Sequence, residues 1–218
     1  MRARRPAEGW PSLVIEQALH AHGFACIAGL DEAGRGAWAG PLTAAAVILP
    51  LEKPGLAGLL SGVRDSKRMT ARQRSCWAES IRQVADAWAV GEAGVDEVDG
   101  IGPLRASRLA MTRALDGLRL APLHLLIDHI CLPEVTLPQT ALPHGDALVL
   151  SIAAASVLAK VARDQRMADL DGVFPVYGFA RHKGYGTPQH QQALQCHGPS
   201  SIHRRSYAPI AALASAGD

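Results

Sequence analysis

Four acidic residues stand where apolar runs end or helices are expected to begin: Asp31, Glu32, Asp128 and Asp146. Carboxylates with no His or Cys among them favour hard divalent ions such as Mg²⁺ or Mn²⁺ over zinc. Two such ions about 4 Å apart can activate a water molecule and stabilise the leaving oxygen of a phosphodiester. Any single acid is as well explained as an N-cap or a solvated loop residue, but four at converging positions favour a metal-dependent hydrolytic site.

The first two acids directly follow a predicted strand. An apolar run over residues 26–30 predicts a buried strand that ends just before Asp31 and Glu32, and a glycine-rich turn, residues 34–40, joins it to a second apolar run, residues 42–49. Open α/β sheets bind ligands at such strand ends. Because neighbours on a strand point to opposite faces, the two acids can share a site only if the strand ends or bulges there.

Periodicity predicts the other elements. We expect helices over residues 11–22, 70–84, 104–118 and 151–170, strands over residues 87–93 and 123–128, a turn over residues 95–102, and a loop or weak edge strand over residues 131–143. Strands joined first by turns and later by helices predict an α/β fold with a mixed sheet. The sheet should be antiparallel at its start and parallel at its finish.

Length and composition indicate one sizeable domain. The chain has 218 residues and a formal net charge of +2, which is too small to indicate a nucleic-acid partner by itself. Any basic surface must be local, for example at Arg2, Arg4 and Arg5. Scattered cysteines with no CxxC pair indicate reduced thiols. With no signal peptide and no run of transmembrane length, we expect a cytoplasmic protein that does not bind a membrane.

The glycine-rich turn has a competing interpretation. Residues 34–39 fit the dinucleotide fingerprint GxGxxG/A after a strand. That fingerprint requires a helix to follow, whereas Pro41 and residues 42–49 predict a strand. Two carboxylates before the turn would also repel a pyrophosphate. We therefore expect a backbone that approaches its ligand closely, with N–H and C=O groups that could read a sugar hydroxyl.

Several motifs together resemble ribonuclease HII over about residues 27–207. They are DEAGRG followed by AGPL, DSK at residues 65–67, the strand ending at Asp128, Gly145-Asp146 followed by SIAAASVLAKVARD, and HKGYGT at residues 182–187. The resemblance implies a ribonuclease H-like fold, with a mixed five-stranded sheet flanked by helices and a C-terminal helical or irregular extension. We expect an N-terminal arm with a short helix (residues 1–24), a catalytic domain (residues 25–176) and a C-terminal substrate-contacting segment (residues 177–218).

The resemblance also assigns roles to residues of this chain. The four acids match the family's metal-binding carboxylates. The residues that match its substrate contacts are the GRG loop (Gly34, Arg35 and Gly36), which senses the 2′-hydroxyl of the ribonucleotide, Tyr185, which packs on the sugar at the RNA to DNA junction, and Lys67 and Lys183, near backbone phosphates.

The implied reaction is hydrolysis of the phosphodiester 5′ of a ribonucleotide, in RNA/DNA hybrids or ribonucleotide-containing duplex DNA, leaving a 3′-hydroxyl and a 5′-phosphate. It implies Mg²⁺ or Mn²⁺, with two ions when substrate is bound, and we expect a monomer. One alternative is a carboxylate-dependent DNA nuclease such as a Holliday-junction resolvase, against which Tyr185 and the GRG turn argue. The other is an inactive hybrid-binding module, against which the presence of all four acids argues.

Some late residues receive no role in the site. Four late histidines and one cysteine could suggest a zinc site, but they lack the spacing of zinc ligands, and we expect them at the solvated surface. They are His182, His190, Cys196, His197 and His203. Arg204, Arg205 and Tyr207 could form a basic, aromatic patch for nucleic acid or pin the tail to the domain. Trp38, beside the glycine turn, is expected to pack.

Three positions depart from the family's usual pattern. His129 stands where Gly is usual, His144 where Lys is usual, and Gly102 where Asn is expected. His129 could crowd the backbone beside a ligand. His144 replaces a fixed positive charge with one that is partial near neutral pH.

His144→Lys should therefore raise the affinity for substrate at pH 8, because lysine keeps its charge there and histidine ordinarily does not. A binding titration with a hybrid duplex at pH 8 measures the effect. An unchanged dissociation constant would count against this expectation.

Overall fold

The computed structural model describes residues 10–214; residues 1–9, with Arg2, Arg4 and Arg5, and residues 215–218 lie outside this part. Its sheet consists of β1 (Ile27–Ala33), β2 (Leu42–Ile48), β3 (Ala87–Ala93), β4 (His124–Asp128) and β5 (Gln139–Leu142). The helices are α1 (Val14–Ala21), α2 (Leu56–Leu59), α3 (Ala71–Val84), α4 (Val95–Asp116), α5 (Gly145–Leu148), α6 (Leu150–Val173), α7 (Phe179–His182), α8 (Pro188–His197) and α9 (Ala208–Ala214), with a 3₁₀ turn at Ser66–Arg68. In this part of the chain, every helix is too short or too polar to cross a membrane.

The sheet has the order β3-β2-β1-β4-β5. The pairs β1–β2 and β2–β3 are antiparallel, whereas β4 runs parallel to both β1 and β5. The predicted antiparallel start and parallel finish are therefore confirmed. For residues 131–143 we expected either a loop or a weak edge strand, and β5 is an edge strand within this range.

β1 extends further than predicted. We expected it to end at Leu30, but its pairing with β2 continues through Asp31 to Ala33. The reason is that the apolar run of β2 is long and buried throughout, so its backbone groups continue the ladder. On the other side β4 ends at Asp128, and its last residue paired with β1 is Ile127, opposite Leu30. The final residues of β1 thus have a paired strand on one side only.

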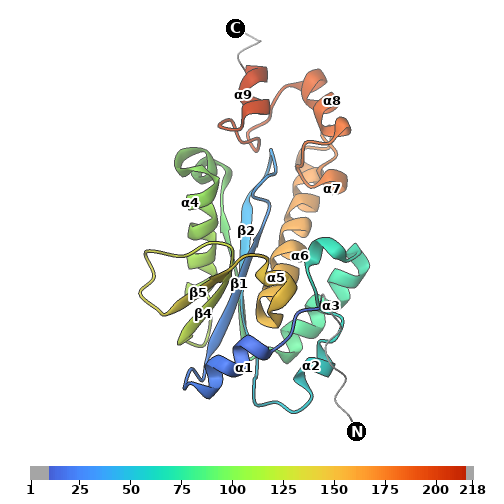
Figure 1. Cartoon of the computed structure of the whole chain (residues 1–218). Coiled ribbons are helices and arrows are strands. Elements are labelled where there is room, and N and C mark those ends of the chain that lie inside the picture. The colour runs from blue at the N-terminus through green and yellow to red at the C-terminus, as the bar shows by residue number, and fades with distance from the viewer. Residues whose placement is uncertain (1–9, 215–218) are drawn as a thin grey trace.

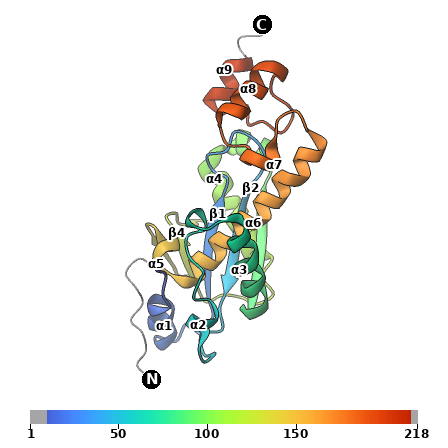
Figure 2. The same cartoon turned by 90° about the vertical axis from the view of Figure 1, so that its right-hand side faces the viewer.

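Helices cover both faces of the sheet (Figure 1). α3 and α6 pack on one face, where Val47, Ile81 and Leu158 belong to one buried core, and α4 packs on the other face, around Leu30 and Met111. The C-terminal helices α8 and α9 lie beyond the turn that joins β1 to β2, and α7 lies next to the end of α6, as Figures 1 and 2 show. Their own small core surrounds Phe179.

α6 approaches β1 so closely that one position of the strand requires glycine. A Cβ on Gly29 would lie 2.3 Å from the backbone carbonyl carbon of Ser151. The turns of α6 from Ile152 to Ala159 are small or apolar and buried, as the sequence predicts. Since alternate residues of a strand share a face, Asp31 faces the same helix as Gly29.

α4 corrects the turn expected at residues 95–102. The chain is helical from Val95, and Glu97 Oε2 accepts the backbone N–H of Gly94 at 2.8 Å. Asp96 and Glu97 of this segment are therefore first-turn residues of a helix, where the helix dipole favours negative charge. Gly102, with φ 79°, interrupts the helix before Pro103.

A buried carboxylate joins α1 to the start of α6. Glu16 is 1% exposed and accepts the backbone N–H of Ser151 at 2.8 Å. Burial raises the pKa of Glu16, and the hydrogen bonds that it accepts oppose the rise. The N-terminal segment thereby satisfies one of the N–H groups that the first turn of α6 leaves free.

Glu16→Ala should lower the free energy of unfolding by about 1–3 kcal/mol, because the Ser151 N–H would be buried without an acceptor. Glu16→Gln keeps an acceptor in place and should cost less. Chemical denaturation of both variants measures the difference. Equal losses would mean that packing, and not the hydrogen bond, carries the contribution of Glu16.

Candidate active site

The four acids meet at one end of the sheet. Asp31 and Glu32 lie on β1, Asp128 is the last residue of β4, and Asp146 lies in the first turn of α5. β1 and β4 are parallel neighbours whose last pair is Leu30 with Ile127, so the next residues, Asp31 and Asp128, lie at the same end of the two strands. β5 returns the chain to the same end, where Asp128 Oδ1 accepts the Gly145 N–H at 2.7 Å.

Burial and mutual repulsion raise the pKa of three of these carboxyl groups. Burial is the largest cause for Asp31, which is 3% exposed, and the charges of Glu32, Asp128 and Asp146 lift its pKa further. Burial also leads the rise in the pKa of Glu32 and of Asp146, and Asp128 adds to both. The acids therefore form one electrostatic cluster. The expectation that β1 must end or bulge for Asp31 and Glu32 to share a site was wrong, because β1 continues in regular pairing with β2 past both acids, while its pairing with β4 ends at Leu30.

Two cationic side chains reach this cluster. Arg35 Nη2 lies 2.7 Å from Glu32 Oε1, and Lys67 Nζ lies 3.8 Å from Asp146 Oδ2. Partial burial lowers the pKa of Lys67, but Asp31 and Asp146 outweigh it and leave the pKa raised. Two cations beside four carboxylates leave a negative site.

The cluster suits a hard divalent cation. Its donors are all carboxylate oxygens, and Glu32 Oε2 is buried with no hydrogen-bond partner in residues 10–214. In the same range no group of three or more His, Cys, Asp or Glu side chains already has the arrangement that would hold a metal ion. Carboxylates without a compensating cation repel one another, and a bound cation would remove the repulsion that raises their pKa.

α6 supplies a site residue that sequence reasoning missed. The hydroxyl of Ser156 hydrogen bonds to Asp31 and opposes the rise in its pKa. Ser156 Oγ also lies 2.9 Å from Ser66 Oγ, in the motif that carries Lys67. The SIAAAS motif contains this serine, but only the contact between α6 and β1 shows which acid it faces.

The GRG loop, residues 34–36, packs against a buried arginine of α6. Gly34 has φ 93°, and a Cβ on it would lie 1.9 Å from Arg163 Nε. Arg163 donates to the backbone carbonyls of Pro41 at 3.0 Å, Ala39 at 3.1 Å and Lys183 at 3.0 Å. Its guanidinium therefore ties the turn after β1 to the HKGYGT motif.

Arg204, for which two interpretations were open, anchors the same turn. Its side chain is 0% exposed and donates Nη1 to the carbonyls of Gly34 at 2.8 Å and Arg35 at 3.0 Å. The Tyr207 hydroxyl also donates to the Arg35 carbonyl. Arg205, by contrast, is exposed. Arg204 and Tyr207 thus pin the tail to the domain.

The anchored carbonyls leave two N–H groups of the GRG loop free. In a trans peptide the N–H points opposite to the C=O. Bonds from Arg204 to the carbonyls of Gly34 and Arg35 therefore turn the N–H groups of Arg35 and Gly36 away from it. Within residues 10–214 neither N–H has an acceptor, and the Cα of Gly36 faces open space.

Tyr185 lies in the loop that packs on this turn. The Trp38 N–H donates to the Gly184 carbonyl at 2.8 Å, which joins the two loops. The half-buried Tyr185 ring has Lys160 Nζ at 5.6 Å and Arg163 Cζ at 5.4 Å from its centre. Cations over an aromatic face are attracted by it and hold its orientation.

The two lysines predicted near phosphates differ in position. Lys67 lies beside the acids, whereas Lys183 Nζ donates to the Asp164 carbonyl of α6 at 3.2 Å. The Asp164 side chain is bound by Lys160, four residues earlier on α6, at 2.6 Å and by Arg74 at 3.4 Å. Lys183 is therefore held against α6.

Three of the late histidines are buried, which corrects the expectation of a solvated surface. His182, His190 and His203 are buried, whereas Cys196 and His197 are exposed. The rings of His182 and His190 stack with centroids 4.4 Å apart, and Nε2 of His190 lies 2.9 Å from Nε2 of His203. Burial lowers the pKa of His190 and of His203 to about 4. Their sequence spacing gives no sign of this contact because tertiary packing creates it.

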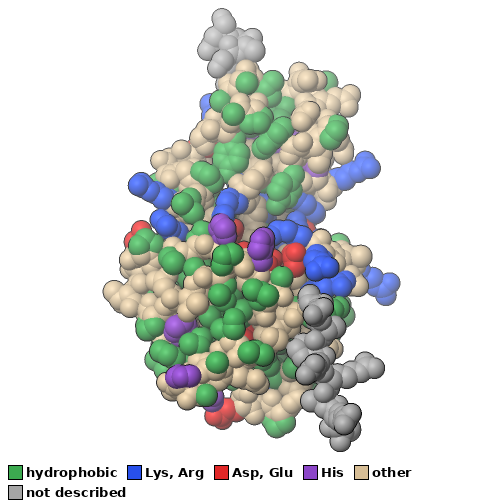
Figure 3. Space-filling model, in the orientation of Figure 1, with side chains coloured by type: hydrophobic (Ala, Val, Ile, Leu, Met, Phe, Trp, Pro, Cys, Tyr) green, Lys and Arg blue, Asp and Glu red, His purple; other side chains and the backbone are tan. Residues whose placement is uncertain are grey.

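Two departures from the family pattern lie next to the acids. His129 and His144 are exposed and have left-handed backbones, with φ 64° and 57°. Glycine adopts this conformation without strain, which accounts for a usual Gly at position 129. Figure 3 shows histidine, acidic and basic side chains gathered in a band across the middle of one face, below the C-terminal helices.

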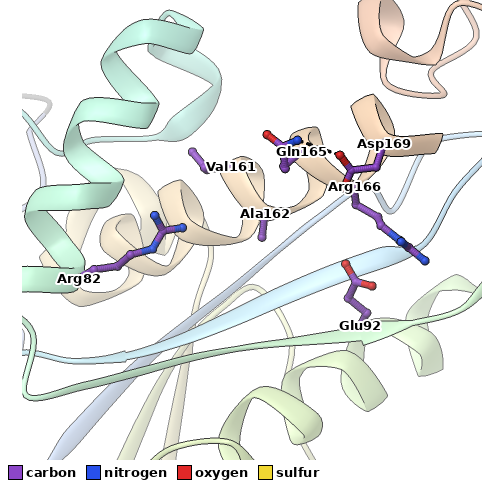
Figure 4. Close-up of a pocket in the computed structure, with 7 residues that line it drawn as sticks. All are labelled: Arg82, Glu92, Val161, Ala162, Gln165, Arg166 and Asp169. Carbon is purple, nitrogen blue, oxygen red and sulfur yellow. Dashed lines mark hydrogen bonds between the residues drawn. The ribbon is translucent and has the colours of Figure 1, made fainter. Parts of the chain in front are cut away.

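A pocket beside β3 is separate from the acid cluster (Figure 4). It encloses about 420 Å³ and is lined by Arg82, Glu92, Val161, Ala162, Gln165, Arg166 and Asp169. β2 separates β3 from β1, and none of the four acids lines this pocket. The candidate site is therefore the acid cluster.

A mixed sheet with four carboxylates at one end, beside a turn with free backbone donors, defines a metal-dependent nuclease of the ribonuclease H-like class. The family model for ribonuclease HII matches residues 28–210. The chain belongs to the ribonuclease HII family.

Similar proteins agree with this assignment. A ribonuclease HII of Thermus thermophilus is 51% identical over 185 residues, 85% of this chain and 87% of its own. A ribonuclease HII of Chloroflexus aggregans is 49% identical over 206 residues, 93% of this chain and 96% of its own. Among solved structures, ribonuclease H2 of Pyrococcus horikoshii has a TM-score of 0.72 at 24% identity, covering 88% of this chain and 98% of its own.

Family membership confirms the predicted reaction class. The protein is an endoribonuclease that cleaves RNA in RNA/DNA hybrids. The two alternatives, a DNA-only nuclease and an inactive binding module, are disfavoured. The ribonuclease H-like fold with a mixed five-stranded sheet is confirmed as well.

The two glycines of the GRG loop should respond differently to substitution. Gly34→Ala should lower the free energy of unfolding by about 1–3 kcal/mol, because its Cβ would meet Arg163 at a positive φ. Gly36→Ala should change it by less than about 0.5 kcal/mol, since its Cβ would point into open space. Urea titrations compare the pair, and similar losses would contradict the geometry described for the loop.

Proposed function

We propose that Asp31, Glu32, Asp128 and Asp146 hold Mg²⁺ or Mn²⁺ and that the cut falls 5′ of a ribonucleotide. The observation that carries this proposal is the cluster of four mutually repelling carboxylates at the ends of β1 and β4. When bound, two divalent ions supply charge that activates water and stabilises the leaving oxygen. The products would be a 3′-hydroxyl and a 5′-phosphate.

The chain's own residues position the substrate in this proposal. The free N–H groups of Arg35 and Gly36 are donors suited to the 2′-oxygen of a ribonucleotide, which a DNA strand lacks. Tyr185 packs on the neighbouring sugar. Lys67, exposed beside Asp146, meets a backbone phosphate, and Lys183 leaves the Asp164 carbonyl to meet another.

Two solved neighbours were determined with a metal ion or a protein partner. A ribonuclease HIII from Bst, 18% identical with a TM-score of 0.68, covers 99% of this chain and 77% of its own and was solved in complex with Mn²⁺. A ribonuclease HII of Archaeoglobus fulgidus, 26% identical with a TM-score of 0.70, covers 84% and 95% and was solved in complex with PCNA. Two ions, activity on single ribonucleotides in DNA, a monomeric state and a cytoplasmic location stay predictions for this chain.

Cleavage of a labelled DNA duplex containing one ribonucleotide tests the proposal. With Mg²⁺ or Mn²⁺ we expect a single cut 5′ of the ribonucleotide and no cut in the all-DNA duplex. Asp128→Asn should slow the cut by about a hundredfold or more, because one carboxylate ligand contributes several kcal/mol of charge stabilisation through the metal.

Asp116→Asn provides a matched control, because Asp116 is an exposed acid of α4 away from the cluster. It should cleave like the unchanged protein, and calorimetry should show Mn²⁺ binding weakened only by Asp128→Asn. Equal activity in both variants would overturn the assignment of Asp128. A protein that binds the duplex and never cuts it would be a binding module, with His129 and His144 the residues to revert.

A further inference from the structure

Residues 200–207, here termed the clasp, contact the first of the two loops that the proposed function assigns to the substrate and reach the second, the Tyr185 loop, through His190. The clasp pairs with the turn after β1 through the Arg204 N–H to the Trp38 carbonyl at 2.8 Å and the Gly40 N–H to the Ile202 carbonyl at 2.9 Å. It lies with α7, α8 and α9 in the C-terminal group of helices (Figure 2). Two consecutive side chains of the clasp, His203 and Arg204, turn inward from this position and are buried.

Arg204 holds the first loop. Its guanidinium binds the carbonyls of Gly34 and Arg35, and it also donates Nε and Nη2 to the Gly40 carbonyl at 3.0 and 2.9 Å. No carboxylate of residues 10–214 forms an ion pair with it. A buried cation is retained only when its hydrogen bonds are made, so the carbonyls of this loop are held in a fixed direction.

His203 reaches the second loop through His190. The Ser200 N–H donates to His203 Nδ1 at 2.9 Å, which leaves the proton of a neutral His203 on Nε2. That Nε2–H points to Nε2 of His190 at 2.9 Å, which must therefore accept, so His190 carries its own proton on Nδ1. His190 Nδ1–H then donates to the Tyr185 carbonyl at 3.0 Å.

Every proton in this relay has one allowed position. A backbone N–H at Ser200 begins it and a backbone carbonyl at Tyr185 ends it, and both rings between them are buried and neutral. The relay therefore fixes the orientation of the Tyr185 peptide relative to the clasp. Arg204, the next residue after His203, fixes the GRG loop relative to the same clasp. These two adjacent residues thus hold both loops to one segment, in addition to the Trp38–Gly184 hydrogen bond and the Arg163 contacts that join the loops directly.

We propose that the His203–His190 relay is a positioning element that holds Tyr185 at one sugar step from the GRG loop and so determines specificity for isolated ribonucleotides. The inference rests on the proposed function of these two loops. An isolated ribonucleotide offers one register in which its 2′-hydroxyl and the next sugar are both recognised. An RNA tract offers a 2′-hydroxyl at every step and tolerates a displaced tyrosine.

The test compares cleavage rates on a DNA duplex with one ribonucleotide and on an RNA-tract hybrid, with Mg²⁺. His190→Leu removes the donor to the Tyr185 carbonyl while nearly keeping the volume, and should lower the single-ribonucleotide to tract ratio about tenfold, the change that one hydrogen bond of about 1.4 kcal/mol produces. His190→Asn places an amide N–H near the position of Nδ1 and should restore most of the ratio.

Tyr177→Phe is the matched control for stability. It removes a hydrogen bond to the Gly198 carbonyl, 2.8 Å long, from the same C-terminal core without touching Tyr185. It should lower the melting temperature and leave the ratio unchanged. If Tyr177→Phe and His190→Leu shift the ratio equally, the relay is merely structural and the inference is overturned.

A double-mutant cycle with Tyr185→Ala separates this inference from the proposed function. If the relay acts through Tyr185, His190→Leu should have no further effect on the ratio once the ring is absent. A lowered ratio in Tyr185→Ala with an undiminished effect of His190→Leu overturns the relay alone. An unchanged ratio in Tyr185→Ala overturns the assignment of Tyr185 and the relay with it.

Discussion

The contact between α6 and β1 is the constraint on which the rest of the site depends. Glycine at position 29 and small residues on the helix let the two backbones meet. Because α6 is placed this closely, Ser156 reaches Asp31. Arg163, nearer the C-terminal end of the same helix, reaches the turn after β1. A single rigid helix therefore sets the position of the acids and of the substrate loops together.

Burying charge is costly, and the protein buries charged groups at the site in two different ways. Asp31 is buried among other carboxylates, which raises its pKa and leaves the cluster in need of a cation. Arg163 and Arg204 are buried among backbone carbonyls and hold loops instead of neutralising acids. In both arrangements the negative charge of the acids stays only partly neutralised by the protein. A reaction that brings in divalent cations with a polyanionic strand supplies the missing positive charge.

Local patterns predicted the elements well where the period was clear. The strands, the helix predicted over residues 70–84 and the buried start of α6 follow from apolar runs and helical periodicity, and the structure has them. The two errors had different causes, one a partner strand and one a local cap. β1 continues to Ala33 because β2 pairs with it there. Residues 95–102, which their acidic composition led us to expect as a turn, are helical because the Glu97 side chain accepts the Gly94 N–H and caps the helix. A single segment carries no information about its partner strand.

The sequence by itself determined the chemistry of this protein: four oxygen ligands, a glycine turn with close backbone approach and a tyrosine downstream, because residue type sets which atoms can bind a hard cation or a sugar. The tertiary structure alone decided how those parts are held. Ser156, Arg163, Arg204 and the buried histidines act through partners that are distant in sequence. Such contacts depend on how helices cross strands and loops return to one place, and no local spacing encodes that geometry.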